Sequence, residues 1–441
     1  MPETSPIEPH AATTARTSRE GDARSERASV TPLLVLAGYT FYVQMLPMFV
    51  RPFVAREFGL DAARMSFLEG LAAVGALGTF WLARRADRHG RRNAILTTTL
   101  CGTAASLATG LAPTVVFFMI AGTALRACVT ALQMVVSVAL SEEARDERRA
   151  RLQSYFGLVA GVGGMLVVVL SGVLENVPGG WRWLYGIAAL PALALPFVGG
   201  SLLETRRFTR AQSRGATQSS RARDLFQPRY RRRAIGLLLA GTLRPIGMVA
   251  LGGWAYYHAV ENLGIPAAQV AWIYMGAVVS MLGNPIGAWM ANRMGRRPTL
   301  VINVVAMLLA GVAYFWIPGH HGLLTVLGLG VTFAAFAFAS QAFAVANRLL
   351  DSECFPTHLR ATYTGANAMG EAIGTVTSYL ALSGLLAWLE NLPLAITLLA
   401  GTAILASVPI FLATAPETRG LTLEEASQEE AEDVRFQPAA E

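Results

Sequence analysis

The sequence predicts an all-α membrane protein with twelve transmembrane helices in two pseudo-symmetric halves of six. Three observations support this fold class. The chain of 441 residues is 53% hydrophobic and has a mean hydropathy of +0.44, and soluble domains rarely combine such values with long charge-free segments. Apolar segments long enough to cross a bilayer follow one another from residue 32 onward. A basic turn also occurs twice, in matching places of the two halves.

The twelve apolar segments are each about as long as a helix that crosses the ~30 Å hydrocarbon core of a bilayer. We expect helices because lipid offers no hydrogen-bond partner to an open backbone. The segments also lack the polar and apolar alternation of a membrane β-barrel. We place the spans at residues 32–52, 65–84, 94–112, 115–140, 152–174, 183–202, 234–257, 267–291, 299–317, 322–347, 361–387 and 393–414.

The two halves share a repeated basic turn. Residues 83–92 read ARRADRHGRR, and residues 288–297 read AWMANRMGRR. Gly90 and Gly295 allow the positive φ that a chain reversal needs, and the arginines anchor helix ends at one membrane face. Two more motifs of the first half recur in the second half in the same order. Glu142 and Arg149 correspond to Glu353 and Arg360, and Glu204-Thr205-Arg206 corresponds to Glu417-Thr418-Arg419. Agreement in order and spacing indicates a duplication rather than chance similarity among arginine-rich loops.

The arginine distribution predicts the orientation of the chain in the membrane. All 36 basic residues are arginine, and 30 of them lie in cytosolic segments if the N-terminus is cytosolic. The other six are Arg51, Arg56, Arg64 and Arg182 in outer loops and Arg126 and Arg244 within spans. Cytosolic loops carry the excess of basic residues in membrane proteins. We therefore expect both termini in the cytosol. The expected location is a bacterial inner membrane, and the expected oligomeric state is a monomer.

Five segments follow from this topology. They are a disordered cytosolic tail over residues 1–31, a six-helix half over 32–203, a cytosolic linker over 204–233, a second six-helix half over 234–415 and a cytosolic tail over 416–441. The first tail is polar with mixed charge, a composition typical of disorder. The linker carries ten arginines, which suits a membrane-surface anchor better than a specific binding site.

Composition and motif spacing argue against other function classes. The net charge of +7 is compatible with nucleic-acid binding, but the arginines lie in loops between apolar spans and no zinc-type spacing accompanies them. The three cysteines, Cys101, Cys128 and Cys354, are too few and too scattered for a disulfide framework. We find no nucleophile–base or metal-binding constellation. The expected partners are a small-molecule substrate and the lipid bilayer, and we expect no enzyme activity, no cofactor and no nucleic acid.

Three ionisable residues stand within spans and away from the membrane surfaces: Arg126, Arg244 and Glu371. A charge at the centre of a transmembrane helix costs roughly 2.5–3.5 kcal/mol, so it normally faces protein or water and often marks function. Helical spacing places two of them on polar stripes. The stripes are Arg126, Thr130, Gln133 and Ser137, and Thr364, Asn367, Glu371, Thr375 and Ser378. The alternative is that arginine and glutamate only neutralise each other between packed helices. Glu69, near the start of the second span, is interpreted as interfacial.

The two basic turns resemble the loop signature of the major facilitator superfamily: Gly, three residues, Asp, a basic residue, any residue, Gly and two basic residues. Ala83 and Ala288 stand where Gly is usual, and Asn292 stands where the second copy would have Asp. Residues 353–357 with Arg360, and residues 416–420, are similar to loops of its sugar porters and metabolite:proton symporters. The resemblance covers about residues 32–425 and is specific for the superfamily.

The resemblance implies that helices 1, 4, 7 and 10 line a central cavity, with Arg126 and Arg244 facing it from opposite halves. It also implies that the two turns and their acidic neighbours gate the cytosolic end. The gating residues would be Asp87, Arg88, Arg91, Arg92, Asn292, Arg293, Arg296, Glu142, Arg149, Glu353 and Arg360. Asn292 is neutral and would lack any charge-based part of this role.

We therefore expect a secondary active transporter that moves a small organic solute, a carboxylate-bearing metabolite, by proton-coupled alternating access. Arg126 and Arg244 are the candidates to hold the substrate anion, because a guanidinium can pair bidentately with a carboxylate. Glu371, interpreted as the only acid in the middle of a span, is the candidate for the coupling proton. The other candidate substrate contacts are Gln133, Asn367, Tyr42, Trp254 and Tyr257. Two alternatives remain open: efflux of a drug or metabolite by proton antiport, and a sensor that does not transport.

Overall fold

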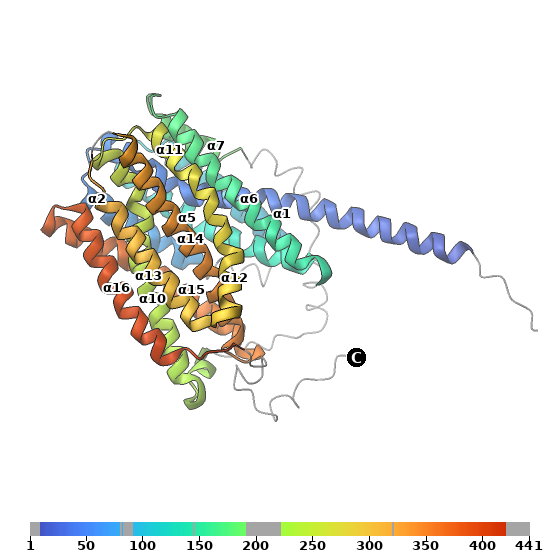
Figure 1. Cartoon of the computed structure of the whole chain (residues 1–441). Coiled ribbons are helices and arrows are strands. Elements are labelled where there is room, and N and C mark those ends of the chain that lie inside the picture. The colour runs from blue at the N-terminus through green and yellow to red at the C-terminus, as the bar shows by residue number, and fades with distance from the viewer. Residues whose placement is uncertain are drawn as a thin grey trace, which may run out of the picture.

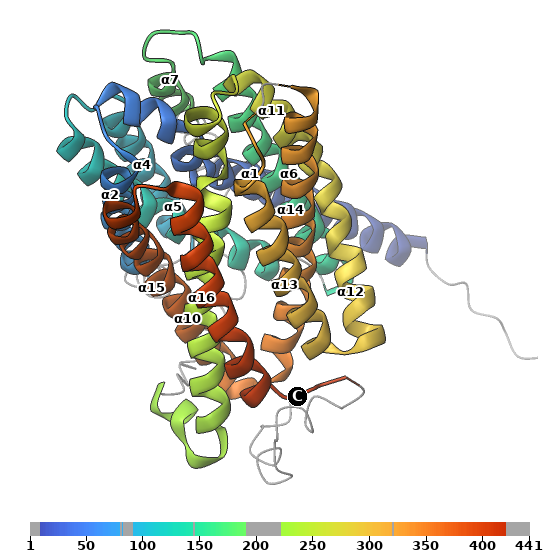
Figure 2. The ribbon, with the colours of Figure 1, turned by 60° about the vertical axis from the view of Figure 1, so that its left-hand side comes forward.

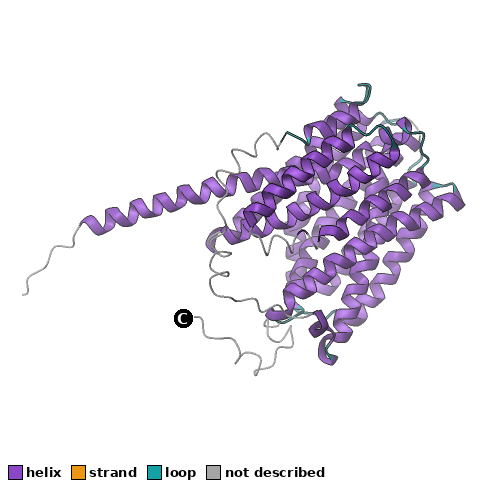
Figure 3. Ribbon diagram, turned by 180° about the vertical axis from the view of Figure 1, so that it is seen from behind, coloured by secondary structure: helices purple, strands orange, loops and turns teal. Residues whose placement is uncertain are grey.

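The structure is a computed structural model that describes residues 9–79, 82, 91–143, 146–190, 222–319 and 322–419. Every regular element in these ranges is a helix (Figures 1 and 3). The first half contains α1 (Pro9–Glu57), α2 (Ala62–Ala73), η1 (Val74–Gly78), α4 (Arg91–Gly110), α5 (Val115–Glu143), α6 (Asp146–Val173) and α7 (Gly180–Ile187). The second half contains η2 (Ala222–Phe226), α10 (Pro228–Tyr257), η3 (His258–Asn262), α11 (Ala267–Gly276), η4 (Ala277–Leu282), α12 (Gly283–Met294), α13 (Arg296–Phe315), α14 (Leu323–Glu353), α15 (Thr357–Leu389) and α16 (Leu392–Thr414).

The described helices agree with the predicted membrane spans. Nine of them, some continuing through a short 3₁₀ or π-helical element, are long and apolar enough to cross a membrane. The predicted span at 94–112 corresponds to α4, a helix of 20 residues. The spans predicted at 65–84 and 183–202 begin as α2 with η1 and as α7, and both continue outside the described residues. The all-helical fold class is therefore confirmed.

Several helices extend beyond the predicted spans. Helix α1 starts at Pro9, whereas we predicted a disordered tail over residues 1–31, and its N-terminal part extends away from the bundle (Figure 1). It also continues to Glu57 through Pro32, Pro47 and Pro52. The predicted spans were bounded by where the apolar residues end, whereas a helix ends only where its backbone hydrogen bonds end. Membrane helices also tolerate internal proline. The predicted linker 204–233 is described from residue 222, where it forms η2 and the first turn of α10.

Among the described residues, the two halves pack together chiefly through three pairs of α-helices, and η1 also packs on α15. Helix α2 packs on α15, α6 packs on α11, and α1 packs on α10, and Figure 2 shows α15 beside α2. Within the halves, glycine permits close helix crossings: a Cβ on Gly163 of α6 would lie 2.0 Å from the carbonyl oxygen of Gly38 in α1. Small residues serve this purpose in membrane helices because they let backbones approach closely.

Among the described residues, polar contacts between the halves gather at one end of the bundle, the end with the loops at 58–61 and 174–179. Arg56 Nε lies 2.6 Å from Glu261 Oε1. The Glu175 carboxylate accepts hydrogen bonds from the backbone N–H groups of Ala267 (2.8 Å) and Ala268 (3.1 Å), where an anion stabilises the N-terminus of α11. The Ser66 hydroxyl donates to the Tyr379 carbonyl (2.7 Å). This is the end that the arginine distribution predicts to lie outside.

Candidate functional site

Glu69 of α2 lies between two arginines of the N-terminal half. Its Oε1 is 3.7 Å from Arg51 Nη2 in α1, and its Oε2 is 3.6 Å from Arg126 Nη1 in α5. Glu69 is 6% exposed and Arg51 is fully buried. Both separations are longer than a hydrogen bond, so Glu69 holds the two guanidinium groups by charge alone. The cluster (Arg51, Glu69 and Arg126) is called the N-half cluster below.

Arg51 reaches across to the C-terminal half. Its Nη1 donates to the Gly253 carbonyl of α10, and its Nη2 lies 3.4 Å from the Tyr379 hydroxyl of α15. The guanidinium carbon also sits 4.4 Å from the centre of the Trp254 ring, which is a favourable cation–π geometry. Arg51 therefore connects the N-half cluster to two helices of the other half.

The prediction missed two members of this cluster. We counted Arg51 with the outer loops, although it lies at the end of the predicted span 32–52, between Pro47 and Pro52. Helix α1 passes through both prolines, so Arg51 lies inside it. We interpreted Glu69 as interfacial, but it is buried against two arginines. Glu371 is therefore not the only acid of the spans that pairs with an arginine inside the bundle.

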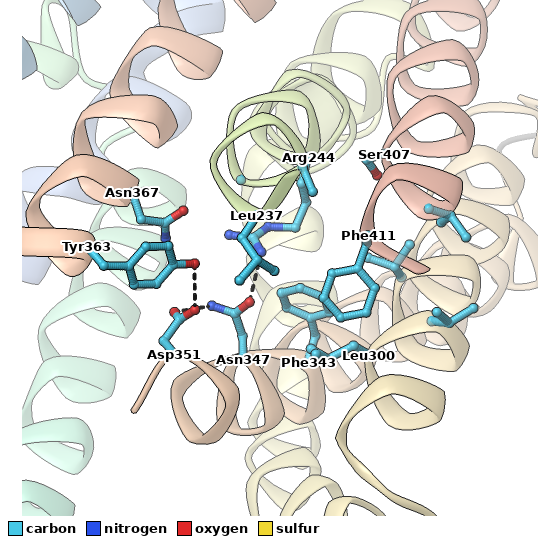
Figure 4. A pocket seen from close by; sticks show the side chains of 15 residues that line it. Leu237, Arg244, Leu300, Phe343, Asn347, Asp351, Tyr363, Asn367, Ser407 and Phe411 are labelled. Carbon is cyan, nitrogen blue, oxygen red and sulfur yellow. Dashed lines mark hydrogen bonds between the residues drawn. The ribbon is translucent and has the colours of Figure 1, made fainter. Parts of the chain in front are cut away.

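A second ionic cluster lies in the C-terminal half, and Figure 4 labels its members Arg244, Asn347, Asp351 and Asn367. Arg244 of α10 donates from Nη2 to Glu371 Oε1 of α15 (2.6 Å) and from Nη1 to Asn347 Oδ1 of α14 (3.2 Å). Asn367 Nδ2 also contacts Glu371 Oε1 (3.5 Å). Asn347 in turn donates to Asp351 Oδ2 (2.8 Å). We call Arg244, Asn347, Asp351, Asn367 and Glu371 the C-half cluster.

A cavity of about 440 Å³ reaches both clusters, through Glu69 and Arg126 of the N-half cluster and through Glu371 of the C-half cluster, and residues of α10 and α14 do not line it. Its walls come from α1, α2, η1, α5 and α7 of the first half and from α15 of the second. Its polar lining consists of Gln44, Glu69, Arg126, Thr130, Gln133, Tyr185, Glu371 and Thr375. The Glu371 side chain is 42% exposed although it is paired with Arg244. Glu371 thus connects the cavity with the C-half cluster.

The remaining predicted substrate contacts lie in different places. Gln133 lines the cavity and accepts a hydrogen bond from Gln44 Nε2. Tyr42 is buried, donates to the Leu184 carbonyl (2.9 Å) and is not among the cavity residues. Trp254 is fully buried beneath Arg51. Tyr257 lines a separate hollow of about 890 Å³ near the 58–61 loop. The structure therefore brings Arg126, Gln133 and Glu371 to the cavity and Arg244 and Asn367 next to it.

The second basic turn is fixed by acidic groups. Glu353 at the end of α14 accepts two hydrogen bonds from the Arg296 guanidinium (3.0 and 3.2 Å) and one from the Thr418 hydroxyl. Glu417 accepts from the backbone N–H groups of Arg296 (2.9 Å) and Arg297 (3.0 Å) at the start of α13. The sequence flagged Glu417 and Thr418 as part of a repeat but assigned them no contact.

The other predicted gating residues are exposed, partly buried or outside the described residues. Asn292 and Arg293 are exposed, and Arg293 lies over the Trp289 ring at 5.5 Å. Arg360 Nη2 is 3.5 Å from the Phe355 carbonyl. Arg92 is partly buried. Asp87 and Arg88 lie outside the described residues, as do the side chains of Arg91, Glu142 and Arg149, so the gating role of the first turn stays a prediction.

Comparison with known proteins assigns the family. The Major Facilitator Superfamily model matches residues 33–379. The chain is 28% identical to "Putative metabolite transport protein YaaU" of Escherichia coli, with 81% of this chain and 85% of that protein covered. It is 27% identical to "Major myo-inositol transporter IolT" of Bacillus subtilis, with 82% and 85% covered. It is also 28% identical to "Probable 4-methylmuconolactone transporter" of Cupriavidus pinatubonensis, with 76% and 78% covered.

Solved structures agree on the fold. The xylose transporter XylE from E. coli superimposes with a TM-score of 0.68 at 18% identity, covering 92% of this chain and 99% of that one. The nucleoside transporter NupG superimposes with a TM-score of 0.73 at 11% identity, covering 88% and 100%. A twelve-helix arrangement in two halves is consistent with these neighbours. The chain belongs to the major facilitator superfamily: it is a multi-pass membrane transporter of the metabolite or sugar type and not an enzyme.

Proposed function

We propose that this transporter carries a small organic solute with a carboxylate group and couples its movement to protons. The observation that supports this most directly is the charge of the N-half cluster. Among the described residues, Arg51 and Arg126 share the single carboxylate of Glu69, and Arg126 Nη1 has no hydrogen-bond acceptor. A buried donor without an acceptor is unfavourable, and Arg126 lines the cavity. A substrate carboxylate placed there would supply the missing acceptor.

The proposed coupling proton binds Glu371. Glu371 faces the cavity and pairs with Arg244 at 2.6 Å. Protonation of Glu371 would remove its charge and leave Arg244 available to a substrate anion, so proton binding and substrate binding would favour each other. Arg126 and Arg244 belong to opposite halves, and a solute that contacts both favours the state in which the halves close around it. The compound in the name of the Cupriavidus relative, 4-methylmuconolactone, carries a carboxylate and is compatible with this proposal.

A direct test uses the purified chain in proteoliposomes. We expect radiolabelled 4-methylmuconolactone, or another small carboxylate from a thermal-shift screen, to accumulate inside under an inward proton gradient. We expect Arg126→Gln to weaken substrate binding roughly 10- to 100-fold, because a hydrogen bond to a charged group contributes about 1.5–3 kcal/mol. Arg64→Gln at an exposed site is the matched control. If no carboxylate stabilises the protein or is transported, the carboxylate proposal fails.

A neutral polyol is the second candidate, because one observation favours it. Gln44 and Gln133 form a pair on the cavity wall, with Thr130 and Thr375 also lining it, and such amides and hydroxyls suit a solute rich in hydroxyl groups. The B. subtilis relative is named as a myo-inositol transporter. Uptake of myo-inositol or D-xylose, unaffected by Arg126→Gln, would select this candidate over the carboxylate.

A further inference from the structure

Asp351 lies in the last turn of α14 and is held by neutral groups. Its Oδ2 accepts a hydrogen bond from Asn347 Nδ2 (2.8 Å), and its Oδ1 accepts one from the Tyr363 hydroxyl (3.1 Å). Among the described residues, no arginine lies within ion-pair distance of it. Asp351 is partly buried, and an ionised carboxylate in such a site without a cation is unfavourable. Asp351 therefore has a physical reason to take up a proton.

The surroundings of Asp351 strengthen this reason. It lines a cavity of about 40 Å³ with Leu300, Phe343 and Phe411, so apolar groups occupy much of the wall (Figure 4). Helices α13 and α16 face this cavity with apolar side chains and the hydroxyl of Ser407. The titratable or charged groups that act on Asp351 are Tyr363 and Glu371 of α15, Arg244 of α10 and Cys354 directly after α14.

A continuous chain of hydrogen bonds connects Asp351 with Glu371. Asn347 donates to Asp351 and accepts from Arg244 Nη1 (3.2 Å), while Arg244 Nη2 donates to Glu371 (2.6 Å). Figure 4 shows the Asn347 side chain between Asp351 and Arg244. One arginine thus serves two carboxylates, one directly and one through an amide. The cluster carries one excess negative charge when both acids are ionised, and one bound proton makes it neutral.

We propose that Asp351 is a second proton-binding residue, coupled to Glu371 through Asn347 and Arg244. The inference rests on the proposed function in one respect: Glu371 is the group that carries the coupling proton. While Glu371 is ionised and paired with Arg244, the proton resides on Asp351. When Glu371 takes up the proton, its ion pair with Arg244 Nη2 is lost and Nη2 is left for a substrate anion, while Arg244 Nη1 keeps its hydrogen bond to Asn347 and so stabilises ionised Asp351. The two carboxyl groups therefore share one proton rather than titrating independently.

Infrared difference spectroscopy tests this without a substrate. The full chain, reconstituted in lipid, is titrated with acid, and the carbonyl stretch of protonated carboxyl groups is followed with and without ¹³C-labelled aspartate. We expect Asp351→Asn to remove a label-sensitive band. In Asp351→Asn we also expect the Glu371 band to appear at a pH roughly one unit lower than in the wild type. The reason is that the variant lacks the negative charge of Asp351, which favours the protonated form of Glu371. Asp61→Asn is the control, since Asp61 is the exposed N-cap of α2 and Asn caps equally well.

A second variant separates coupling from general loss of structure. Asn347→Leu leaves both carboxyl groups in place but breaks the chain between them. In the Asn347→Leu background, we expect the added change Asp351→Asn to leave the pH at which the Glu371 band appears unchanged. With Asn347 intact, we expect Asp351→Glu to keep the two carboxyl groups coupled. A titration of Asp351→Asn that superimposes on the wild type would overturn the inference while leaving the role of Glu371 intact. Absence of any proton-driven transport in the wild type would instead overturn the proposed function, whatever the spectra show.

Discussion

At the scale of single residues, the two ionic clusters carry opposite charge when all their acids are ionised. The N-half cluster has two arginines for the carboxylate of Glu69, and the C-half cluster has Arg244 for the carboxylates of Glu371 and Asp351. Buried ions need compensating partners. A substrate carboxylate would neutralise the first cluster and a proton would neutralise the second. Binding of an anion together with a proton would therefore leave the centre of the transporter without excess charge.

Glu371→Gln tests the proton side of this balance. We expect exchange of labelled for unlabelled substrate to persist, since the amide preserves shape, and accumulation driven by a pH gradient to disappear. In the wild type, a gradient of one pH unit supports ~10-fold accumulation for one proton per solute, because 1.4 kcal/mol is a factor of ten. The control is Glu390→Gln at the end of α15. Undiminished accumulation in Glu371→Gln would make Glu371 only a structural partner of Arg244.

The sequence predicted some of these residues and not others for a simple reason. Arg126, Arg244 and Glu371 stand out because each is a lone charge in a long apolar run. Arg51 and Glu69 lie near the ends of apolar runs, where a charge normally faces water, and the packing of α1 on α10 and of α2 on α15 buries them. The pairing of charges also depends on which helices are neighbours in space, which one sequence does not reveal.

At the scale of elements, the turn between α12 and α13 depends on Gly295. Its φ of 105° and ψ of 164° lie in a region that is almost exclusive to glycine. A Cβ there would also lie 2.7 Å from Glu417 Oε2. Since Glu417 accepts the hydrogen bonds of the first two N–H groups of α13, the glycine is what lets this carboxylate reach the helix. The repeat in the sequence identified the turn, but not the acid that holds it.

Gly295→Ala should therefore destabilise the C-terminal half by about 1–3 kcal/mol, the usual cost of a residue held in such a backbone region, and the steric conflict with Glu417 adds to it. The comparison is Gly59→Ala, at φ 62° with open space around the new Cβ, where only the milder left-handed strain of roughly 1–2 kcal/mol applies. Thermal unfolding in detergent measures both. Equal midpoints for the two variants would mean that the Glu417 contact contributes nothing to stability.

At the scale of the whole molecule, the orientation in the membrane is still a prediction, and labelling can decide it. The arginine distribution places residues 58–61 outside and residues 204–233 inside. In a variant without Cys101, Cys128 and Cys354, we expect Asp61→Cys to react with an impermeant maleimide added to intact cells. Ser213→Cys should react only after the cells are opened. Reaction of Ser213→Cys from outside would show that the orientation is the opposite of the predicted one. The end at which the halves are joined would then face the cytosol.

The contacts that join the halves differ in strength, and this predicts which residue holds the outer end closed. Arg56 is half exposed in its pair with Glu261, and such pairs contribute about 0–1 kcal/mol. Arg51 is fully buried and contacts Glu69, Gly253 and the Trp254 ring together. Hydrogen bonds from a charged group contribute about 1.5–3 kcal/mol, so its loss should shift the closed-to-open ratio roughly 10- to 100-fold.

The reporter for this shift is a cysteine at Thr375, on the cavity wall of α15. We expect Arg51→Ala to raise the rate at which an impermeant maleimide added outside reaches this cysteine, and Arg56→Ala to change that rate less than fivefold, within the range of an exposed ion pair. Arg51→Lys should lie between them, because lysine keeps the charge but loses the planar group that stacks on Trp254. Equal rates for all three variants would show that closure depends on helix packing between α2 and α15 and not on Arg51.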